Sequence, residues 1–303
     1  MTERWLVVGA GGQLGSDLMR VLDGQYEIGL TRHELDITDT DAVARAVAAV
    51  VPSVIVNAAA YTAVDAAETD EAAAFVANAT APAALAAAAA RAGAKFVHVS
   101  TDYVFAGDAT VPYDEAAQTG PRSAYGRTKL AGEQAVLGEL PDAYVVRSAW
   151  IYGASGANFV KTMARLERER ETVSVVDDQR GSPTWSYDLA RGLVALASSG
   201  AAGGIYHYTN AGETTWFGFT RAIFEELGAA PERVLPVRTA AFPRPAPRPA
   251  YSVLGNRRWI EAGLPPPATW REALRDAFEA VGPSLRGDDA QGAQGAPGDR
   301  SAT

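Results

Sequence analysis

The 303-residue chain contains no cysteine. The absence of thiols excludes disulfide bonds, thiolate metal sites and a cysteine nucleophile, and it fits a reducing compartment. The formal net charge is −9, so the chain lacks the excess positive charge that nucleic acid or anionic lipid would attract. A phosphorylated ligand is still compatible with this charge, because backbone amides and a few arginines can bind phosphate locally.

Long apolar runs are also missing. The closest approach is the alanine-rich stretch Ala72–Ala94, which Asn78, Pro82 and Arg91 interrupt, whereas a membrane-spanning helix needs about 20 apolar residues. The N-terminus has neither the apolar segment nor the cleavage pattern of a secretion signal. We therefore expect a cytoplasmic protein.

Short β-branched runs alternate with longer helical patterns in the first half of the chain. The predicted strands are Trp5–Val8, Glu27–Leu30, Val54–Val56, Phe96–Val99 and Tyr144–Val146. The predicted helices between them are Gln13–Leu22, Asp41–Val51, Glu71–Gly93 and Ser123–Leu140. This alternation predicts an α/β fold with a Rossmann-like, doubly wound parallel sheet. Pro82 should kink or break the third helix.

The pattern beyond Trp150 is less regular and predicts a smaller α/β substrate-binding domain. Its predicted elements are a strand at Thr172–Val176 and helices at Phe159–Arg170, Tyr187–Ser198, Trp216–Leu227 and Thr269–Val281. We expect residues 1–153 to form the dinucleotide-binding domain, with about 185–215 returning to it. Residues 154–184 and 216–281 would form the smaller domain. Residues 282–303 are rich in small and polar residues and are predicted to be a disordered tail.

A glycine-rich turn joins the first strand to the first helix. Gly9, Gly12 and Gly15 are its glycines, and Gln13 and Leu14 open the helix. Glycine permits a tight turn there and lets backbone N–H groups approach a pyrophosphate at the helix N-terminus. The turn therefore predicts a dinucleotide site.

The residues after the second strand bear on the choice of cofactor. An NAD-binding protein often has an Asp or Glu there for the ribose hydroxyls, but this chain has Thr31-Arg32. A guanidinium suits a 2′-phosphate, which favours NADPH over NADH. Asp36 and Ile37, slightly downstream, are expected to lie against the adenine.

Two further stretches are candidates for cofactor contact. Ala60, Tyr61 and Thr62 follow the third strand, where small residues would let the cofactor pass over the carboxyl edge of the sheet. Close packing of helix on strand is the alternative explanation. Asn78, in the long helix, is either a polar link to the site or an exposed helical residue.

Three residues are candidates for the catalytic chemistry. Tyr125 and Lys129 are spaced so that they share one face of a helix, one turn apart. An ammonium near a phenol favours the phenolate and lowers the phenol's pKa, which would make Tyr125 a usable general acid or base. Thr101 follows the fourth strand, so its hydroxyl is expected at the same sheet edge, ready to bind a substrate carbonyl.

Together these motifs resemble the extended short-chain dehydrogenase/reductases and, among them, the dTDP-4-dehydrorhamnose reductase family. The likeness runs from about Arg4 to Val281. The stretches that carry it are Gly9–Gly15, Asn57–Thr62, Ser100–Phe105, Tyr125–Glu133, Ser148–Gly153, Asn158–Met163, Asp177–Thr184 and Arg248-Pro249. The segments Ser100–Phe105 and Asp178–Thr184 are the most specific to the sugar reductases.

The resemblance implies reduction of the C4 keto group of a dTDP-4-dehydro-6-deoxy-L-hexose, with NADPH as reductant and NADH as the alternative. Tyr125 would donate the proton to the forming alkoxide, and Lys129 would lower its pKa and hold the nicotinamide ribose. Thr101 would hydrogen-bond the carbonyl oxygen. The residues implied to contact the substrate are Thr101, Asp102, Trp150, Asn158, Arg180 and Arg248.

The resemblance also raises the question of a metal. Some family members are dimers with Mg²⁺ held by glutamates at the interface. The matching regions of this chain carry Asp17 and Tyr187, so we predict no metal site and leave both the need for Mg²⁺ and the choice between monomer and homodimer open. The expected partner is a dTDP-sugar, with no nucleic acid and no membrane.

Two alternatives stay open. A sister ketoreductase for another deoxysugar would share the catalytic residues, since the stereochemical choice depends on a few pocket contacts worth about 1–3 kcal/mol each. The regulatory β subunit of methionine adenosyltransferase, a binding partner, resembles the same family. Intact Thr101, Tyr125 and Lys129 favour an enzyme.

Overall fold

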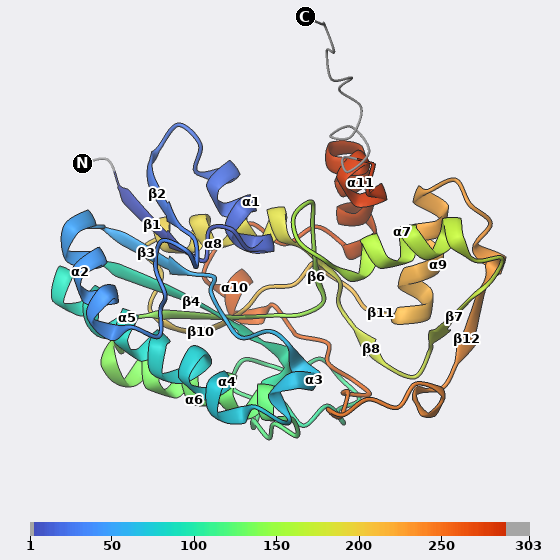
Figure 1. The fold of residues 1–303 in the computed structure, drawn as a ribbon, viewed down its shortest axis with the longest axis horizontal. Coiled ribbons are helices and arrows are strands. Elements are labelled where there is room, and N and C mark those ends of the chain that lie inside the picture. Colours follow the sequence, from blue (N-terminus) through green and yellow to red (C-terminus); the bar gives the residue numbers. More distant parts are fainter. Residues whose placement is uncertain (1–2, 289–303) are drawn as a thin grey trace, which may run out of the picture.

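The structure is a computed structural model and describes residues 3–288. Its centre is a parallel six-stranded sheet in the order β10-β5-β4-β3-β1-β2 (Figure 1). The strands are β1 (Arg4–Val8), β2 (Tyr26–Leu30), β3 (Val54–Asn57), β4 (Lys95–Thr101), β5 (Tyr144–Ser148) and β10 (Gly204–His207). The first strand lies inside the sheet and the order reverses beside it, which is the Rossmann arrangement. The predicted fold class is confirmed.

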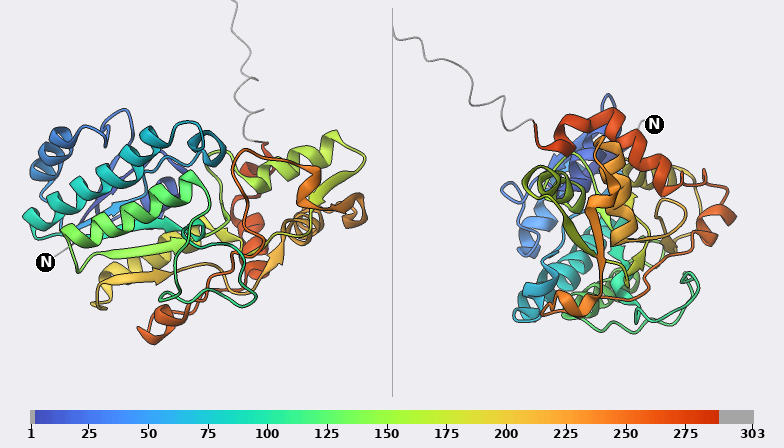
Figure 2. Two further views of the ribbon diagram at one scale, coloured as in Figure 1. Left: turned by 90° about the horizontal axis from the view of Figure 1, so that it is seen from below. Right: turned by 90° about the vertical axis from the view of Figure 1, so that its right-hand side faces the viewer.

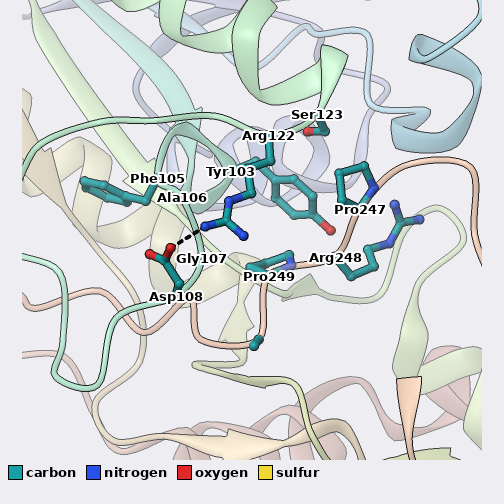
Figure 3. A pocket seen from close by; sticks show the side chains of 11 residues that line it. Tyr103, Phe105, Ala106, Gly107, Asp108, Arg122, Ser123, Pro247, Arg248 and Pro249 are labelled. Atoms are coloured by element: carbon teal, nitrogen blue, oxygen red, sulfur yellow. Dashed lines mark hydrogen bonds and ion pairs between the residues drawn. The ribbon is translucent and has the colours of Figure 1, made fainter. Parts of the chain in front are cut away.

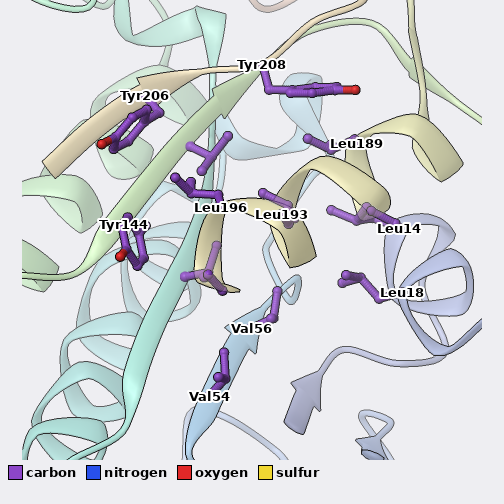
Figure 4. Packing of buried hydrophobic residues seen from close by; sticks show 14 of the residues in the cluster. Leu14, Leu18, Val54, Val56, Tyr144, Leu189, Leu193, Leu196, Tyr206 and Tyr208 are labelled. Atoms are coloured by element: carbon purple, nitrogen blue, oxygen red, sulfur yellow. The ribbon is translucent and has the colours of Figure 1, made fainter. Parts of the chain in front are cut away.

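Helices cover both faces of this sheet (Figures 1 and 2). One face carries α1 (Gln13–Val21) and α8 (Ser186–Ser198), and the other carries α2 (Thr40–Val50), α5 (Ala81–Ala92) and α6 (Ala124–Glu139). Side chains alternate along β1, so Trp5 and Val7 pack on the first face and Leu6 and Val8 on the second. Figure 4 shows the first face, where leucines of α1 and α8 meet the strands.

The predicted helix Glu71–Gly93 forms, but Pro82 does not break it. It consists of α4 (Glu71–Phe75), a π-helical turn (Val76–Thr80) and α5, with Pro82 in the first turn of α5. A proline has no N–H for the usual helical bond, and the widened turn directly precedes it. Of the described residues, this stretch is the one helix long and apolar enough to cross a membrane, yet half of it is buried. It packs against α2 and α6 as a core helix.

A second lobe lies beside the sheet (Figure 2). It contains α7 (Phe159–Glu169), α9 (Trp216–Glu226), α11 (Trp270–Arg286) and the parallel pair β7 (Val173–Val176) and β12 (Val234–Val237). Its separate core includes Tyr152, Trp185, Phe219 and Phe278. The shorter elements are α3 (Val64–Ala67), α10 (Arg257–Glu261), β6 (Ile151–Tyr152), β8 (Arg180–Gly181), β9 (Thr184–Trp185) and β11 (Thr214–Thr215).

The chain returns to the sheet twice, and only the first return was predicted. Segment 186–207 supplies α8 and β10. The segment around α10, predicted to belong to the second lobe, instead buries Trp259 in the sheet core, where its ring meets Tyr208 edge-on at 4.7 Å. The burial of the large Trp259 side chain therefore attaches this segment to the sheet, although the segments before and after it in the sequence belong to the second lobe.

The last helix is longer than predicted. α11 continues through Pro283 to Arg286, after a local kink at Val281 with φ −138°. Leu285 is fully buried in the core of the second lobe, and this burial compensates for the proline. The predicted disordered tail therefore starts too early. The part of that prediction from 289 to 303 lies outside the described residues.

Candidate active site

The glycine turn opens a cradle at the start of α1. Gly9 has φ 85°, and a Cβ on Gly15 would lie 2.1 Å from the Gly9 carbonyl oxygen, so helix and strand approach too closely for any side chain there. A Cβ on Gly12 would meet only that oxygen, at 3.2 Å. No side chain caps α1, and Gln13 Oε1 is buried without a partner. Uncapped N–H groups beside open backbone fit the pyrophosphate of a dinucleotide.

The two glycines should respond differently to substitution. Gly12→Val should abolish NADPH binding with a smaller loss of stability than a substitution at Gly15, because its Cβ would meet only the Gly9 carbonyl oxygen, at 3.2 Å. Gly15→Ala should lower stability as well, because its Cβ would collide with backbone. NADPH titration and thermal unfolding of both variants check this. Full cofactor affinity in a folded Gly12→Val protein would place the dinucleotide elsewhere.

Arg32 is exposed just beyond β2, beside the glycine turn. Thr31 lies next to Gly11, at 3.4 Å from the position of a Cβ on that glycine. Within residues 3–288, no hydrogen bond or ion pair engages the Arg32 guanidinium. Its position and free charge fit the predicted contact with a 2′-phosphate.

Asp36 and Ile37 fit the cofactor less well. The Asp36 carboxylate accepts the Thr38 N–H at 3.0 Å and the Thr38 hydroxyl at 2.8 Å, and these bonds lower its pKa. Ile37 is buried in the core with Leu6 and Val8. Core packing takes most of the Ile37 side chain, and a contact between this residue and the adenine stays a prediction.

Arg32→Ala should weaken NADPH binding by about 1.5–3 kcal/mol, the range for hydrogen bonds to a charged group. NADH binding should change little, because NADH has no 2′-phosphate. Dissociation constants for both cofactors provide the measurement. Arg45→Ala, another exposed arginine of the same domain, is the matched control. Equal losses for the two cofactors would contradict this role of Arg32.

The loop after β3 is held from behind by Asn78. Asn78 Oδ1 accepts the Tyr61 N–H at 2.8 Å, and Nδ2 donates to the Tyr61 carbonyl and to Thr128 Oγ1, both at 3.1 Å. Asn78 is fully buried, so the alternative of an exposed helical residue is wrong, and Asn78 is a polar link to this loop; its contact with the cofactor stays a prediction. Ala60 and Tyr61 remain half-buried and Thr62 exposed, which leaves this loop available to a ligand.

Tyr125 and Lys129 lie on one face of α6, as predicted, and two glycines bring that helix close to its neighbours. A Cβ on Gly126 would lie 2.3 Å from the Tyr103 carbonyl oxygen, and one on Gly132 would lie 2.0 Å from that of Asn78. The Tyr125 ring packs edge-on against Tyr103 at 5.5 Å. Burial raises the pKa of Tyr125 to about 12, opposed by a hydrogen bond with Thr101 and reinforced by Asp102. The free protein therefore holds this phenol protonated.

Lys129 does not act on Tyr125 in the way predicted. Its ammonium is buried and donates to the Val99 carbonyl at 2.7 Å. Burial lowers the pKa of Lys129 to about 8, with Glu133 opposing, and Lys129 is absent from the groups that shift Tyr125. The predicted lowering of the phenol's pKa is therefore wrong for the unliganded protein, since the amine faces the sheet.

His98 is a neighbour of Lys129 that the sequence did not indicate. It is fully buried, and its Nε2 lies 3.5 Å from Lys129 Nζ. Asn57 Oδ1 accepts the Ala59 N–H, so Asn57 Nδ2 faces His98 Nδ1 at 3.1 Å. Burial and the Lys129 charge hold the pKa of His98 well below its usual range. A neutral imidazole thus borders the lysine.

A buried ion pair supports the same helix one turn further on. Arg147 on β5 donates through Nε and Nη2 to the two oxygens of Glu133, at 2.8 and 2.7 Å, and both side chains are 2% exposed. Ser100 donates to the same carboxylate at 2.6 Å. Tyr125, Lys129 and Glu133 therefore form one stripe of α6 against β4 and β5.

Thr101 ends β4 at the carboxyl edge, as expected. Its hydroxyl donates to Asp102 Oδ1 at 2.9 Å and accepts the Tyr103 N–H at 3.2 Å. Both Thr101 and Asp102 are buried. Ser148, which ends β5, pairs in register with Thr101, and this pairing brings Trp150 to the same edge.

Trp150 joins the two lobes at this edge. It has a left-handed φ of 49°, uncommon for a residue other than glycine, and its ring stacks on Trp216 at 3.5 Å, with 7° between the planes. Gly181 leaves room for it, since a Cβ there would lie 2.5 Å from the Trp150 ring. Strained backbone of this kind is concentrated at functional sites.

The other three predicted substrate residues already have partners. Asn158 caps α7: its Oδ1 accepts the Lys161 N–H and its Nδ2 donates to Gly153. The cap and the bond to Gly153 take one bond each from the oxygen and the nitrogen of its amide, and its contact with phosphate or sugar stays a prediction. Arg180 pairs with Glu213 at 3.0 Å on the surface. Arg248 pairs with Asp65 at 2.8 Å.

Arg248 nevertheless lines a hollow next to Tyr103 (Figure 3). Arg122, Ser123 and Pro247–Ala250 complete much of its wall, and Arg122 pairs there with Asp108. Arg180 lines a second hollow with Asp177, Glu213 and Tyr251. Ala250 borders both hollows, so a strap of chain, Pro247–Ala250, separates them and carries Arg248 itself.

The positions considered for a metal serve another purpose. Asp17 is buried, and its carboxylate accepts the Ser186 hydroxyl at 2.5 Å and Arg20 Nη1 at 2.7 Å. The Arg20 guanidinium lies over the Tyr187 ring, 4.9 Å from its centroid. These contacts join α1 to α8. In the described part of the chain, no group of three or more His, Asp or Glu side chains is placed to hold a metal ion.

Comparison with known proteins places these features in context. Residues 3–282 match the family model of the RmlD substrate binding domain. A probable dTDP-4,6-dihydroxy-2-methyloxan-3-one 4-ketoreductase of Streptomyces antibioticus is 52% identical over 283 residues, which cover 92% of this chain and 95% of the relative. A dTDP-4-dehydrorhamnose reductase of Streptomyces griseus is 52% identical over 285 residues, with coverages of 92% and 94%.

A solved structure agrees with the sequence relatives. The crystal structure of dTDP-4-dehydrorhamnose reductase from Bacillus anthracis in complex with NADP has a TM-score of 0.89 to this chain at 40% identity. The match covers 92% of this chain and 99% of that one. The whole described fold, second lobe included, thus has a counterpart in that protein.

Proposed function

The chain belongs to the family of the RmlD substrate binding domain, and from this membership we propose that it is an NADPH-dependent reductase of dTDP-4-dehydro-6-deoxy-L-hexoses. The reaction converts the C4 ketone of dTDP-4-dehydrorhamnose into the hydroxyl of dTDP-L-rhamnose. The observation that carries the proposal is that Thr101 and Tyr125 meet at the carboxyl edge of the sheet. Parallel sheets of this kind bind their ligands at that edge.

The cradle at the start of α1 would hold the pyrophosphate, and Arg32 the 2′-phosphate. Bound NADPH would supply the two electrons that reduce the ketone. Tyr125 holds a phenolic proton and would give it to the alkoxide oxygen at C4, where negative charge develops. Lys129, one helical turn away on α6, would hold the nicotinamide ribose of bound NADPH.

The strap and the second lobe would hold the rest of the substrate. Trp150 offers an aromatic face at the sheet edge, and Asp102 lies beside Thr101. Arg180 and Arg248 would bind the diphosphate, since arginine matches phosphate geometry. Each would exchange its carboxylate partner, Glu213 or Asp65, for phosphate oxygens.

A sister ketoreductase of another dTDP-deoxysugar is the second candidate. One specific observation favours it: the Streptomyces antibioticus 4-ketoreductase and the Streptomyces griseus dehydrorhamnose reductase are equally similar to this chain, both 52% identical. The catalytic residues would be the same, and the stereochemistry at C4 and the substitution at C2 would differ. We further propose a cytoplasmic location and either a monomer or a homodimer.

Incubation with NADPH and dTDP-4-dehydrorhamnose tests the proposal. NADPH consumption should yield dTDP-L-rhamnose, identified by chromatography and by NMR of the sugar. A product with a different C4 configuration, or turnover only with a 2-deoxy or branched ketosugar, would support the sister enzyme. Absence of turnover with every dTDP-4-ketosugar would reject both candidates. Parallel reactions with added Mg²⁺ or with a chelator show whether the metal is needed.

A further inference from the structure

The hydrogen bonds of the Thr101 hydroxyl conflict with binding a ketone. A hydroxyl donates one proton and accepts at two lone pairs. The Thr101 proton goes to Asp102 Oδ1 at 2.9 Å, and one lone pair accepts the Tyr103 N–H at 3.2 Å. The other lone pair faces Tyr125, which also hydrogen-bonds with Thr101, so no Thr101 proton remains for a ligand. A ketone oxygen is an acceptor without a proton, so Thr101 in this state has nothing to donate to it.

The Asp102 carboxyl favours the neutral form. It is 4% exposed, and its Oδ2 is buried without a hydrogen-bond partner. Burial raises the pKa of Asp102 to about 6, while the Thr101 hydroxyl, backbone N–H groups and the nearby Ser252 hydroxyl, which is itself without a well-aligned partner, lower it in part. An ionised carboxylate away from water is costly, and taking up a proton removes its charge.

The groups around Asp102 come from three parts of the chain. Thr101 and Tyr103 flank it, Tyr125 faces it from α6, and Ser252 faces it from the segment before α10. Arg248 and Asp65 act on Tyr103, but no charged side chain is among the causes of the Asp102 shift. Both phenols have pKa values raised from their ordinary range, chiefly by burial. Asp102 is therefore the member of this set that titrates near neutral pH.

We propose that Asp102 is a positioning residue whose protonation turns the Thr101 hydroxyl toward the substrate ketone. As a carboxylic acid, Asp102 donates from Oδ1 to Thr101 Oγ1, which then accepts from Asp102 and Tyr103 and donates its own proton to the ketone oxygen. As a carboxylate, Asp102 accepts the Thr101 proton, so Thr101 has no proton to donate to the ketone. The acid proton stays on Asp102 throughout, so no covalent step is involved. The inference rests on the proposed function, because it requires a ketone in the site.

Proton uptake on binding follows from this arrangement. If the ketone selects protonated Asp102, binding above about pH 6 must take up close to one proton per site, and uptake must vanish well below pH 6. Affinity for the ketone should then fall by up to about tenfold per pH unit above pH 6. Isothermal titration calorimetry in buffers of different ionisation enthalpy measures the uptake. NADP⁺ is included because it cannot reduce the ketosugar, and dTDP, which has no ketone, is the control ligand.

Three variants separate this role from a general charge effect. Asp102→Asn carries a neutral amide that donates permanently, so ketone affinity should become independent of pH and proton uptake should disappear. Thr101→Val has no hydroxyl to turn, so uptake should disappear there too, with weaker binding. Asp188→Asn, at a half-buried carboxyl of raised pKa on α8, should bind with the same uptake as the unaltered protein. Persisting uptake in Thr101→Val would mean that the carboxylate acts directly on the ligand, and would overturn the proposal.

A measurement on the free protein tests the carboxyl itself. Infrared difference spectra should show a carboxylic-acid C=O band that titrates near pH 6 and is lost in Asp102→Asn but not in Asp188→Asn. Absence of such a band would overturn the proposal whatever the substrate is. If the protein turns over the ketosugar but the Asp102→Asn and unaltered proteins take up equal numbers of protons on binding, the proposal for Asp102 is overturned. The proposed function would then stay intact. Absence of turnover with any dTDP-4-ketosugar would reject the proposed function first.

Discussion

Tyr125→Phe should lower turnover by about 10²–10⁴-fold, the usual effect of removing a positioned acid. The substitution deletes only the hydroxyl, so the ring keeps its edge-on contact with Tyr103 and NADPH should bind as before. Because burial keeps the pKa of Tyr125 near 12, the phenol is protonated at working pH and is available as a donor. Steady-state kinetics and NADPH titration of the folded variant provide the measurement.

Tyr144→Phe is the matched control for this prediction. Tyr144 is also buried, but its hydroxyl donates to the Ala201 carbonyl at the opposite end of β5, so its loss should leave turnover near normal. A Tyr125→Phe enzyme with near-normal turnover between about pH 6 and 9 would show that the proton comes from another donor. The mechanism argued above would then fail.

Glu133→Leu should destabilise the protein by about 3–5 kcal/mol, because it leaves the Arg147 guanidinium buried without a counter-ion. Arg147 is 2% exposed, and its guanidinium also contacts the Glu115 carbonyl and His207 Nε2, both at 3.4 Å, and lies over the Phe105 ring at 4.9 Å. None of these groups is charged at neutral pH, since burial and then the Arg147 charge lower the pKa of His207 to about 3. The free energy of unfolding from urea titration is the measurement.

The double variant Glu133→Leu/Arg147→Met sharpens this test. Replacing both charges with apolar side chains should recover most of the lost stability, since the cost comes from one uncompensated charge and not from the pair. Glu169→Gln, which breaks the exposed pair with Arg165, should change stability by less than about 1 kcal/mol. A Glu133→Leu loss as small as that of the control would mean that water reaches Arg147.

Features set by local sequence were the ones that could be predicted. β-branched runs between glycines and helical stretches gave the strands of the sheet, because a parallel sheet buried on both faces needs continuous apolar runs. The glycine turn and the Tyr125–Lys129 spacing depend on a few neighbouring residues, so their position at the sheet edge followed from the order of the elements. The family resemblance added the functional assignment.

Features set by distant contacts could not be predicted. Arg180 and Arg248 looked free for phosphate, but each meets a carboxylate far away in sequence, Glu213 and Asp65. For Asn78, which lies buried in the π-helical turn, the sequence left open whether the side chain faced the site or solvent. Nothing in the sequence distinguished His98 from the other residues of its buried strand. Asn158 is different: an Asn directly before a helical pattern is an N-cap signature, which could have indicated its role.

The stacked pair Trp150–Trp216 gives the protein a built-in optical probe. Trp150 follows β5 of the sheet, and Trp216 begins α9 of the second lobe, with 3.5 Å between their ring centroids. Two indoles in such close contact couple their electronic transitions, and this coupling depends steeply on separation and angle. Near-ultraviolet circular dichroism therefore reports how the two lobes meet, in the unlabelled protein. Any rearrangement of the lobes around a ligand becomes visible without an introduced fluorophore.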